Sequence, residues 1–330
     1  MKCLVTGANG FLGTNLVHEL VREGWQVRAS GRQPAPCRWI AGLPVDYVAA
    51  DITDASRVQE IVSGCEVVFH VAGDTSFWKR RYASQRANNV DGTRHVAQAC
   101  LDQGVRRMVS TSTADVFGYD PSGGMVDESH PFNYTGLDYH YGETKYEADQ
   151  VLRRLIDAGL DAVLVHPGSI IGPFDHTLQF GRLFFELKQG QVPGAPPGGA
   201  SFCHARDVAR AHIRAAEKGR RGESYLLAGN ADTNVSHATL MRMMAEAVGA
   251  KPPARVIPRW LLVGYAAGCE ALSAVTQRPP QLNPGQARYM SLPQYCDSRK
   301  AVRELDYQIP SLQRCIEDAL DWYRSNGFEI

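Results

Sequence analysis

The first thirteen residues, MKCLVTGANGFLG, constrain the fold more than any other stretch of the chain. Cys3 to Thr6 form an apolar, β-branched run that is too short for a helix and therefore predicts a buried strand. Gly7, Gly10 and Gly13 follow, and a segment with helical spacing of apolar residues then continues to Gly24. A strand, a glycine turn and a helix bring backbone N–H groups and a positive helix end against a pyrophosphate. An ordinary tight turn is the alternative, but the position at the first strand–helix junction favours a dinucleotide site.

The composition is that of a sizeable α/β protein without a charge preference. With 330 residues and 44% hydrophobic content, the chain can form one large core and a smaller lobe. Thirty-five basic residues balance thirty-five acidic ones, so no global field attracts nucleic acid or an anionic membrane. Eight cysteines show no zinc-like spacing, which predicts reduced thiols and no metal site. Because the chain opens on a strand of the fold, we expect no signal peptide and a cytoplasmic location.

The second predicted strand, Trp25 to Arg32, ends where such folds bind the adenosine ribose. An NAD site places a carboxylate there for the 2′-hydroxyl, whereas an NADP site places a cation for the 2′-phosphate. The tip is Ser30-Gly31-Arg32 and carries no carboxylate. This favours NADP(H), with Arg32 as the phosphate partner and NAD as the alternative cofactor. A solvated surface arginine is the competing interpretation.

The third predicted strand, Val45 to Ala50, is followed by groups suited to an adenine ring. The Asp51 carboxylate can accept from the adenine amino group, and Ile52 can cover the ring. Asp54 is the alternative reason for an acid here, since it can cap the helix expected over 55–62.

The fourth predicted strand, Glu66 to Val71, leads into Ala72-Gly73, where small residues allow the backbone to pass close to the cofactor's ribose. The aromatic and cationic segment from Asp74 to Tyr82 predicts a loop over the active site. A helix is then expected from Asn88 to Gln103.

A hydroxyl cluster and a tyrosine–lysine pair follow. Arg107 to Thr113 predicts a fifth strand, and hydroxyls at its carboxyl end point into the ligand crevice of a parallel sheet. Tyr141 and Lys145 lie one turn apart on a helix expected to run to about Ala158. The pKa of a tyrosine is about 10. A lysine beside it, together with an oxidised nicotinamide, lowers that pKa and makes the phenol useful for acid–base catalysis. A surface pair is the alternative, but the order of motifs is the one that hydride transfer requires.

These blocks together resemble an extended short-chain dehydrogenase/reductase of the NAD-dependent epimerase/dehydratase superfamily, over nearly the whole chain. TGANGFLG matches TGxxGxxG, STSTADVFG resembles SSxxVYG, and YGETK matches YxxxK. The resemblance implies a catalytic trio of Thr113, Tyr141 and Lys145, with Ser112 next to the catalytic hydroxyl. Together with the arguments above, it implies cofactor contacts by Gly7, Gly10, Phe11, Leu12, Gly13, Arg32, Asp51, Ile52, Val71, Ala72, Gly73, Asn89, Tyr141, Lys145, Pro167 and Ile170.

The expected fold class is α/β, a Rossmann-type doubly wound parallel sheet with a smaller C-terminal substrate-binding lobe. Residues 1–172 are expected to bind NAD(P), with returning segments near 200–230, and residues 173–330 to form mainly the substrate lobe. The resemblance also implies a homodimer through the helices near Asn88 and Tyr141. Apolar residues of those helices are Val90, Val96, Val151, Leu152, Leu155 and Ile156.

The block from His166 to Pro173 resembles RPxxVxGP, which holds the nicotinamide, with His166 in place of arginine. Its apolar Ser169-Ile170-Ile171 is closer to the dihydroflavonol reductase and 3-beta-hydroxysteroid dehydrogenase branch than to sugar-nucleotide epimerases. Ser201 to Ala216 resembles that branch too.

The substrate pocket is expected to be apolar and aromatic. We expect Phe77, Trp78, Tyr134, Tyr139 and the 174–185 segment to frame it. The apolar run from 260 to 275 is short for a membrane span and predicts a helix that covers the pocket. A peripheral membrane-surface anchor is the alternative.

The sequence therefore predicts an NADP-dependent oxidoreductase, a ketone reductase or alcohol dehydrogenase, that acts on a fairly apolar small molecule with Tyr141 as acid/base. A sugar-nucleotide epimerase or dehydratase is the first alternative, because Lys79, Arg80, Arg81 and Arg182 could bind a diphosphate. A non-catalytic NADP-sensing protein is the second.

Overall fold

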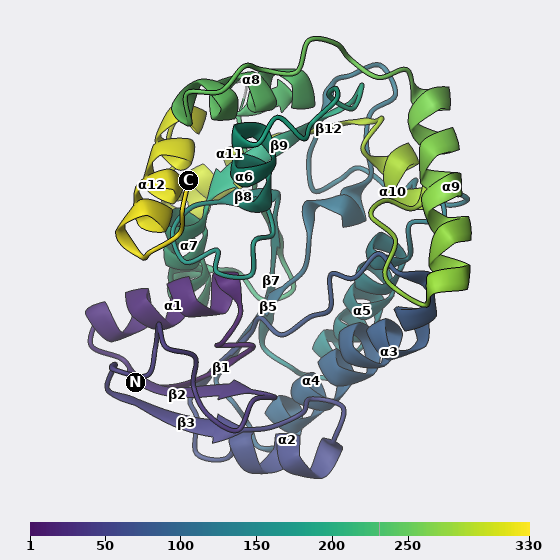
Figure 1. Ribbon diagram of the computed structural model, residues 1–330. Coiled ribbons are helices and arrows are strands. Elements are labelled where there is room, and N and C mark those ends of the chain that lie inside the picture. Colours follow the sequence, from purple (N-terminus) through teal and green to yellow (C-terminus); the bar gives the residue numbers. More distant parts are fainter. Residues whose placement is uncertain (231) are drawn as a thin grey trace.

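The N-terminal strand lies inside a parallel sheet of seven strands in the computed structural model, which describes residues 1–230 and 232–330 (Figure 1). Val5 of this strand, β1, lies opposite Ala29 of β2 on one side and Phe69 of β4 on the other. In spatial order the strands are β10 (Ser224–Leu227), β7 (Ala162–Pro167), β5 (Arg107–Thr111), β4 (Val67–His70), β1 (Lys2–Thr6), β2 (Gln26–Gly31) and β3 (Val45–Ala49). The order reverses between β1 and β4, and such a reversal opens a crevice at the carboxyl ends of the strands. The expected Rossmann-type fold is confirmed.

Helices cover both faces of this sheet. One face carries α1 (Phe11–Arg22), α7 (Ala205–Lys218) and α11 (Arg299–Leu305), whose apolar residues join those of β1, β2 and β7 in one core. The other face carries α2 (Ala55–Val62), α4 (Gly92–Asp102) and α5 (His140–Asp157), which form a second core with Leu4 and Val68. Each face follows from alternation along the strands, because neighbouring residues such as Leu4 and Val5 point to opposite sides.

A smaller lobe lies beyond the carboxyl ends of the strands. Its sheet has β11 (Asn234–Ser236), β9 (Gly199–His204), β12 (Pro293–Cys296) and β6 (Met125–Val126), with β8 (Ser169–Ile171) paired to β9. A third core joins α6 (Arg182–Lys188), α8 (His237–Ala247) and α12 (Leu312–Ser325).

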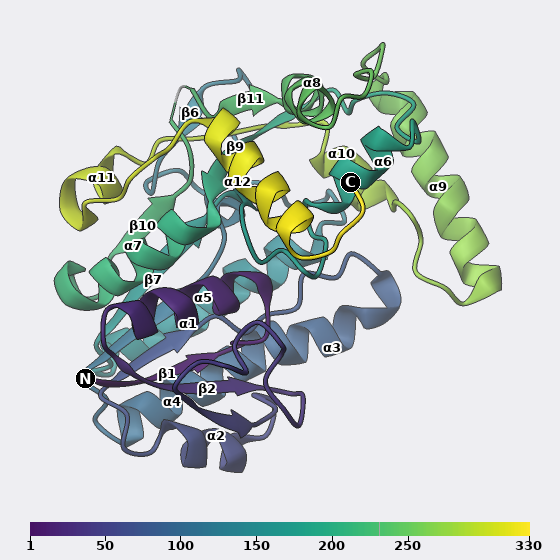
Figure 2. The ribbon, with the colours of Figure 1, turned by 60° about the vertical axis from the view of Figure 1, so that its left-hand side comes forward.

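The helix expected over 260–275 is α9 (Arg259–Thr276), which runs along the outer edge of the molecule (Figure 2). It packs on the short α10 (Pro284–Tyr289) through Leu262, Ala266 and Ala287. Its outer side carries Trp260, which is 75% exposed, and Val275, which is 81% exposed. Among the described residues, no helix combines the length and the apolar character that crossing a membrane requires.

The segment expected to be a loop followed by a helix at Asn88 folds differently. A 3-10 turn (Lys79–Arg81) leads into α3 (Tyr82–Arg86), a π-helical turn (Ala87–Asp91) and then α4. The prediction of a helix beginning at Asn88 was therefore six residues too late, since no capping residue or glycine marked the true beginning. A further 3-10 turn, Ala114–Phe117, follows β5.

Candidate active site

One cavity of about 1570 Å³ lies at the carboxyl ends of the parallel strands, between the sheet and the smaller lobe. Its wall begins at the glycine turn, passes the ends of β2 and β5, and reaches α9 and α10. This is the crevice in which doubly wound folds bind their ligands. Its wall contains most of the predicted cofactor residues and all three predicted catalytic residues.

The glycine turn fits a pyrophosphate because its backbone leaves no room for side chains. Gly7 has a φ of +69°, and a Cβ there would lie 2.7 Å from the Cα of Ala72. A Cβ at Gly13 would lie 2.1 Å from the carbonyl oxygen of Gly7. Gly10 caps α1 without a side chain, and the first residues of the helix line the cavity, so the N–H groups of its first turn are not capped by a side chain there. A dinucleotide's diphosphate is the group that such a cradle accommodates.

At the adenosine end, Arg32 and Ile52 line the cavity and Asp51 does not. Arg28 on the same strand pairs with Asp46, with 3.1 Å between Nε and Oδ2. Arg32, by contrast, is exposed and forms no ion pair within residues 1–230 and 232–330. The Asp51 carboxylate accepts from the backbone N–H and the hydroxyl of Thr53, both at 2.9 Å, so one of its oxygens is used in a turn.

Most of the other predicted cofactor residues line the cavity: Gly7, Gly10, Phe11, Leu12, Gly13, Val71, Ala72, Gly73, Pro167 and Ile170. Asn89 does not, because it is buried in the π-helical turn. Its side chain accepts from the N–H of Asp74 at 2.7 Å and donates to Thr144 at 3.0 Å. The structure therefore gives Asn89 a bracing contact with the loop after β4. Trp78 also lies outside the cavity wall, whereas Phe77 is in it.

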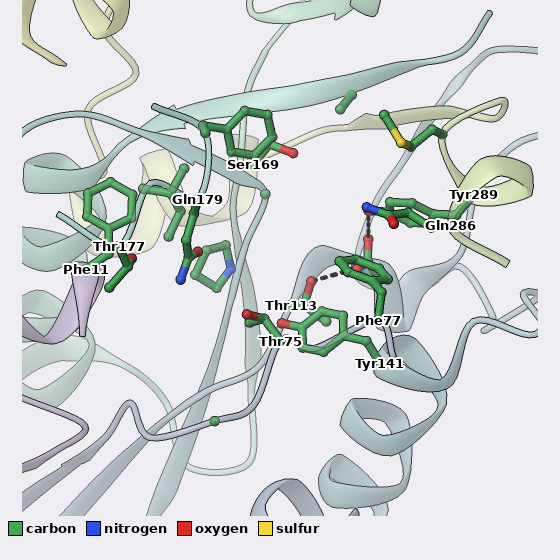
Figure 3. Close-up of a pocket in the computed structure, with 18 of the residues that line it drawn as sticks. Phe11, Thr75, Phe77, Thr113, Tyr141, Ser169, Thr177, Gln179, Gln286 and Tyr289 are labelled. Atoms are coloured by element: carbon green, nitrogen blue, oxygen red, sulfur yellow. Dashed lines mark hydrogen bonds between the residues drawn. The ribbon is translucent and has the colours of Figure 1, made fainter. Parts of the chain in front are cut away.

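The predicted catalytic residues meet at the end of β5. Tyr141 and Lys145 come from the first turns of α5, and Thr113 follows the strand itself. Figure 3 shows the hydroxyl of Tyr141 turned toward Thr113, with Phe77, Gln286 and Tyr289 beside them. Lys145 is buried, and its ammonium donates to the carbonyl of Thr111 at 2.8 Å.

Burial dominates the pKa of Tyr141 in the protein alone. It raises this pKa, and the Asp115 carboxylate raises it further. Burial also lowers the pKa of Lys145, while the Asp149 carboxylate opposes that shift. The lowering expected from Lys145 requires an oxidised nicotinamide as well, so it stays a prediction for the enzyme with its cofactor bound.

His166, which stands where the family's RPxxVxGP block has arginine, contacts the backbone of the predicted catalytic residue Thr113. It is fully buried, and its Nδ1–H donates to the carbonyl of Thr113 at 3.3 Å. Its ring lies edge-on to Phe117, with centroids 4.7 Å apart. Burial lowers the pKa of His166 to about 3, so the imidazole is neutral.

Sequence reasoning missed the role of Asp115, a buried carboxylate in the cavity wall. It accepts from Thr113, Tyr139 and Tyr289. An acid two residues after a strand-end hydroxyl was the available signal. Tyr289 carried none, because it lies 174 residues further along the chain.

The fold and site define an extended short-chain dehydrogenase/reductase. A family model described as the NAD dependent epimerase/dehydratase family matches residues 3–228, so the chain belongs to that family. A Synechocystis protein whose name includes dihydroflavonol 4-reductase is 30% identical over 98% of this chain and 95% of its own length. Sterol demethylase protein B of Methylococcus capsulatus is 31% identical, with 99% of each chain covered. The crystal structure of gox2253 is 30% identical, covers 99% of each chain and has a TM-score of 0.85.

The expected branch is confirmed, since relatives named for dihydroflavonol reductase and 3-beta-hydroxysteroid dehydrogenase activity match. Other relatives are also named as reductases, which supports oxidoreductase chemistry in an NAD(P)-dependent family.

Proposed function

We propose that the protein is an NADP-dependent oxidoreductase that interconverts a ketone and a secondary alcohol on a fairly apolar substrate. One observation carries the proposal: Thr113, Tyr141 and Lys145 converge in the wall of the cavity that begins at the glycine turn. The glycine turn would hold the dinucleotide, and Arg32 would bind its 2′-phosphate. The bound dinucleotide supplies the hydride that the protein's side chains cannot provide.

The protein's own residues would handle the proton. Tyr141 holds its proton at neutral pH, because its pKa is raised by burial, and it would give that proton to the reduced carbonyl oxygen. Thr113 would donate a hydrogen bond to the same oxygen. Lys145 brings a positive charge to the nicotinamide ribose and stabilises the phenolate that remains. In the reverse direction the same groups accept the alcohol's proton.

An apolar substrate is supported by the wall of the lobe. The apolar and aromatic residues of this wall are Phe77, Tyr134, Tyr139, Phe180, Leu183, Leu240, Met241, Ile257, Leu261, Leu262, Leu282, Tyr289 and Met290. Aromatic and aliphatic side chains of this kind bury apolar substrate surface. Names such as sterol demethylase protein B, a 31% identical relative, agree with this class.

Most of the cations that could bind the diphosphate of a sugar nucleotide form ion pairs with carboxylates of the protein. Lys79 pairs with Asp138 and Glu270, and Arg81 pairs with Asp74. Lys79, Arg80 and Arg81 all lie outside the cavity wall. Arg182 does line it but bonds Glu186, with 2.7 Å between Nε and Oε1. Arg255 also lines the cavity. It keeps the epimerase alternative open, because a diphosphate needs a cationic partner. An NADP-sensing protein stays the weakest alternative, since a sensor has no need of Tyr141 and Lys145.

The test is NADPH consumption with a panel of hydrophobic ketones and, separately, with UDP-sugars. Stoichiometric NADPH oxidation with ketones supports the reductase. Conversion of a UDP-sugar without net NADPH loss would instead establish the epimerase, and binding of NADPH without either reaction would leave the sensor.

The remaining parts of the proposal concern organisation. We propose that residues 1–172, completed by returning segments near 200–230, bind the cofactor and that 173–330 mainly form the substrate lobe. A cytoplasmic location is supported by eight free cysteines.

A homodimer is also proposed, although five of the six apolar residues named for it are buried within the protomer and Leu155 is partly buried. Sedimentation at micromolar concentration tests it, and a species of 36.3 kDa alone would refute it.

A further inference from the structure

Asp115 is buried in the cavity wall, and its carboxylate collects three hydroxyl groups. Thr113 Oγ1 and Tyr139 OH donate to Oδ2 at 3.1 and 2.7 Å, and Tyr289 OH donates to Oδ1 at 2.9 Å. No lysine, arginine or histidine in the described part of the chain forms an ion pair with it. Burial raises the pKa of Asp115, while the three hydroxyl donors oppose that shift. A buried acid without a cation therefore depends on these hydroxyls.

Thr113 is tied to Asp115 from both sides of its hydroxyl group. It donates to the carboxylate and also accepts from the backbone N–H of Asp115 at 3.4 Å. A hydroxyl has one proton and two lone pairs, so a single lone pair remains for the cavity. To donate to a carbonyl oxygen, Thr113 must turn its proton from Asp115 to the substrate. During that exchange the Asp115 carboxylate keeps the hydrogen bonds from Tyr139 and Tyr289, so it is not left without a donor.

Tyr289 connects this cluster to the far wall of the cavity. Its ring stacks on Tyr139, with centroids 4.1 Å apart and planes 18° apart. The backbone of α10 lies directly against the segment before α5: a Cβ at Gly285 would be 2.1 Å from the carbonyl oxygen of Asp138. The neighbouring α9 places Leu261, Leu262 and Tyr265 in the cavity wall. Asp115 thus lies where the turn after β5, residues 113–117, meets the wall formed by 259–289.

We propose that Asp115 is a positioning residue: it fixes the oxygen of Thr113, accepts its hydrogen bond in the free enzyme and releases it to the substrate. Through its hydrogen bond with Tyr289, the same carboxylate fixes the position of the α9–α10 wall relative to the turn at 113–117. This inference rests on the proposed function, because it requires Thr113 to act on the substrate oxygen.

The experiment is a double-mutant cycle with NADPH and 2-decalone as an apolar ketone. Thr113→Val, Asp115→Asn and the double variant are compared for kcat, KM and NADPH affinity. We expect Asp115→Asn to lower kcat about 10- to 100-fold, because a misplaced catalytic group costs that much, with NADPH affinity unchanged. In the Thr113→Val background the same change should cost about twofold or less, because it acts through Thr113.

Tyr289→Phe removes one donor and keeps the stacked ring, so a kcat loss of about three- to tenfold is expected. Tyr307→Phe is the matched control, since this buried hydroxyl donates to the carbonyl of Ala228 at 3.2 Å and lies outside the cavity wall. Thermal unfolding of each variant reports folding. If Asp115→Asn does not fold, the cycle is run with Tyr289→Phe and Thr113→Val.

The outcomes separate the two proposals. If Thr113→Val keeps the wild-type kcat, the proposed catalytic trio is wrong. If Thr113→Val is impaired but Asp115→Asn costs the same factor in both backgrounds, the positioning role of Asp115 is overturned and the trio stands.

Discussion

The ammonium of Lys145 donates to the backbone carbonyl of Thr111, with 2.8 Å between Nζ and O. This bond joins the second turn of α5 to the last residue of β5, so the helix face that carries Tyr141 is fixed over the strand end. The tyrosine and the strand-end hydroxyls are therefore positioned by the same contact.

Tyr141→Phe should lower kcat by about 10²–10⁴-fold, the contribution of a positioned acid–base group. The ring still fills its place in the cavity wall, so NADPH should bind with nearly unchanged affinity. Steady-state kinetics and a fluorescence titration with NADPH measure the two quantities. A variant that keeps most of the wild-type kcat would remove Tyr141 from the mechanism.

Thr113→Ala should be more damaging than Ser112→Ala, although both residues line the cavity. Thr113 is the one bonded into the Asp115 cluster. Loss of one donor to a developing oxyanion costs about 10²–10³-fold in kcat. Parallel kinetics on the two variants decide the matter, and a larger loss for Ser112→Ala would reverse the assignment.

Arg32→Ala should weaken NADPH binding about tenfold or more, since a charge-assisted contact contributes roughly 1.5–3 kcal/mol. NADH affinity should hardly change, because NADH has no 2′-phosphate. Arg38→Ala is a nearby control, since the Arg38 guanidinium stacks on Trp39 at 4.0 Å and lies outside the cavity wall. Equal losses for both cofactors on titration of Arg32→Ala would refute the phosphate contact.

The protein should lose stability as the pH falls below about 6.5. Burial lowers the pKa of His70 to about 3 and that of His212 to about 4. The unfolded chain binds protons near pH 6.5, while the folded state does not, so each histidine removes up to about 1.4 kcal/mol per pH unit on acidification. Asp149 acts in the opposite sense, because burial raises its pKa to about 6.

Urea unfolding at pH 7.5 and 5.5 measures this effect. The Nδ1–H of His212 donates to the carbonyl of Val208, so its Nε2 accepts from the hydroxyl of Thr111. His212→Gln offers an amide oxygen as the acceptor for Thr111 and should flatten the pH dependence. His130→Gln is the control, since His130 lies near the surface and bonds the carbonyl of Phe117. If His212→Gln and the wild type show the same slope, His212 does not contribute to it.

Local patterns predicted most of the fold and most of the residues that line the cofactor end of the cavity. Periodicity located β1, α1 and α2 within three residues, because the apolar spacing of each element is set by the face it buries. The Asp115 cluster was beyond such reasoning, since Tyr289 reaches it through tertiary packing alone. Asn89 and Trp78 do not line the cavity, because the segment from Lys79 to Asp91 folds into successive turns that no local pattern indicated. A cofactor contact by Asn89 stays a prediction. The pKa of Tyr141 depended on burial, which no spacing reports.

The position of β10 has a consequence for synthesis on the ribosome. This edge strand comes from 224–227, and α7, whose Val208 and Ile213 share a core with Leu16 and Val17 of α1, comes just before it. A nascent chain of 172 residues already contains the glycine turn, Tyr141 and Lys145 but lacks α7 and α11, two of the three helices that cover one face of its sheet. We therefore expect the emerging chain to expose part of that apolar face, and to need chaperone protection, at least until α7 and β10 have left the exit tunnel.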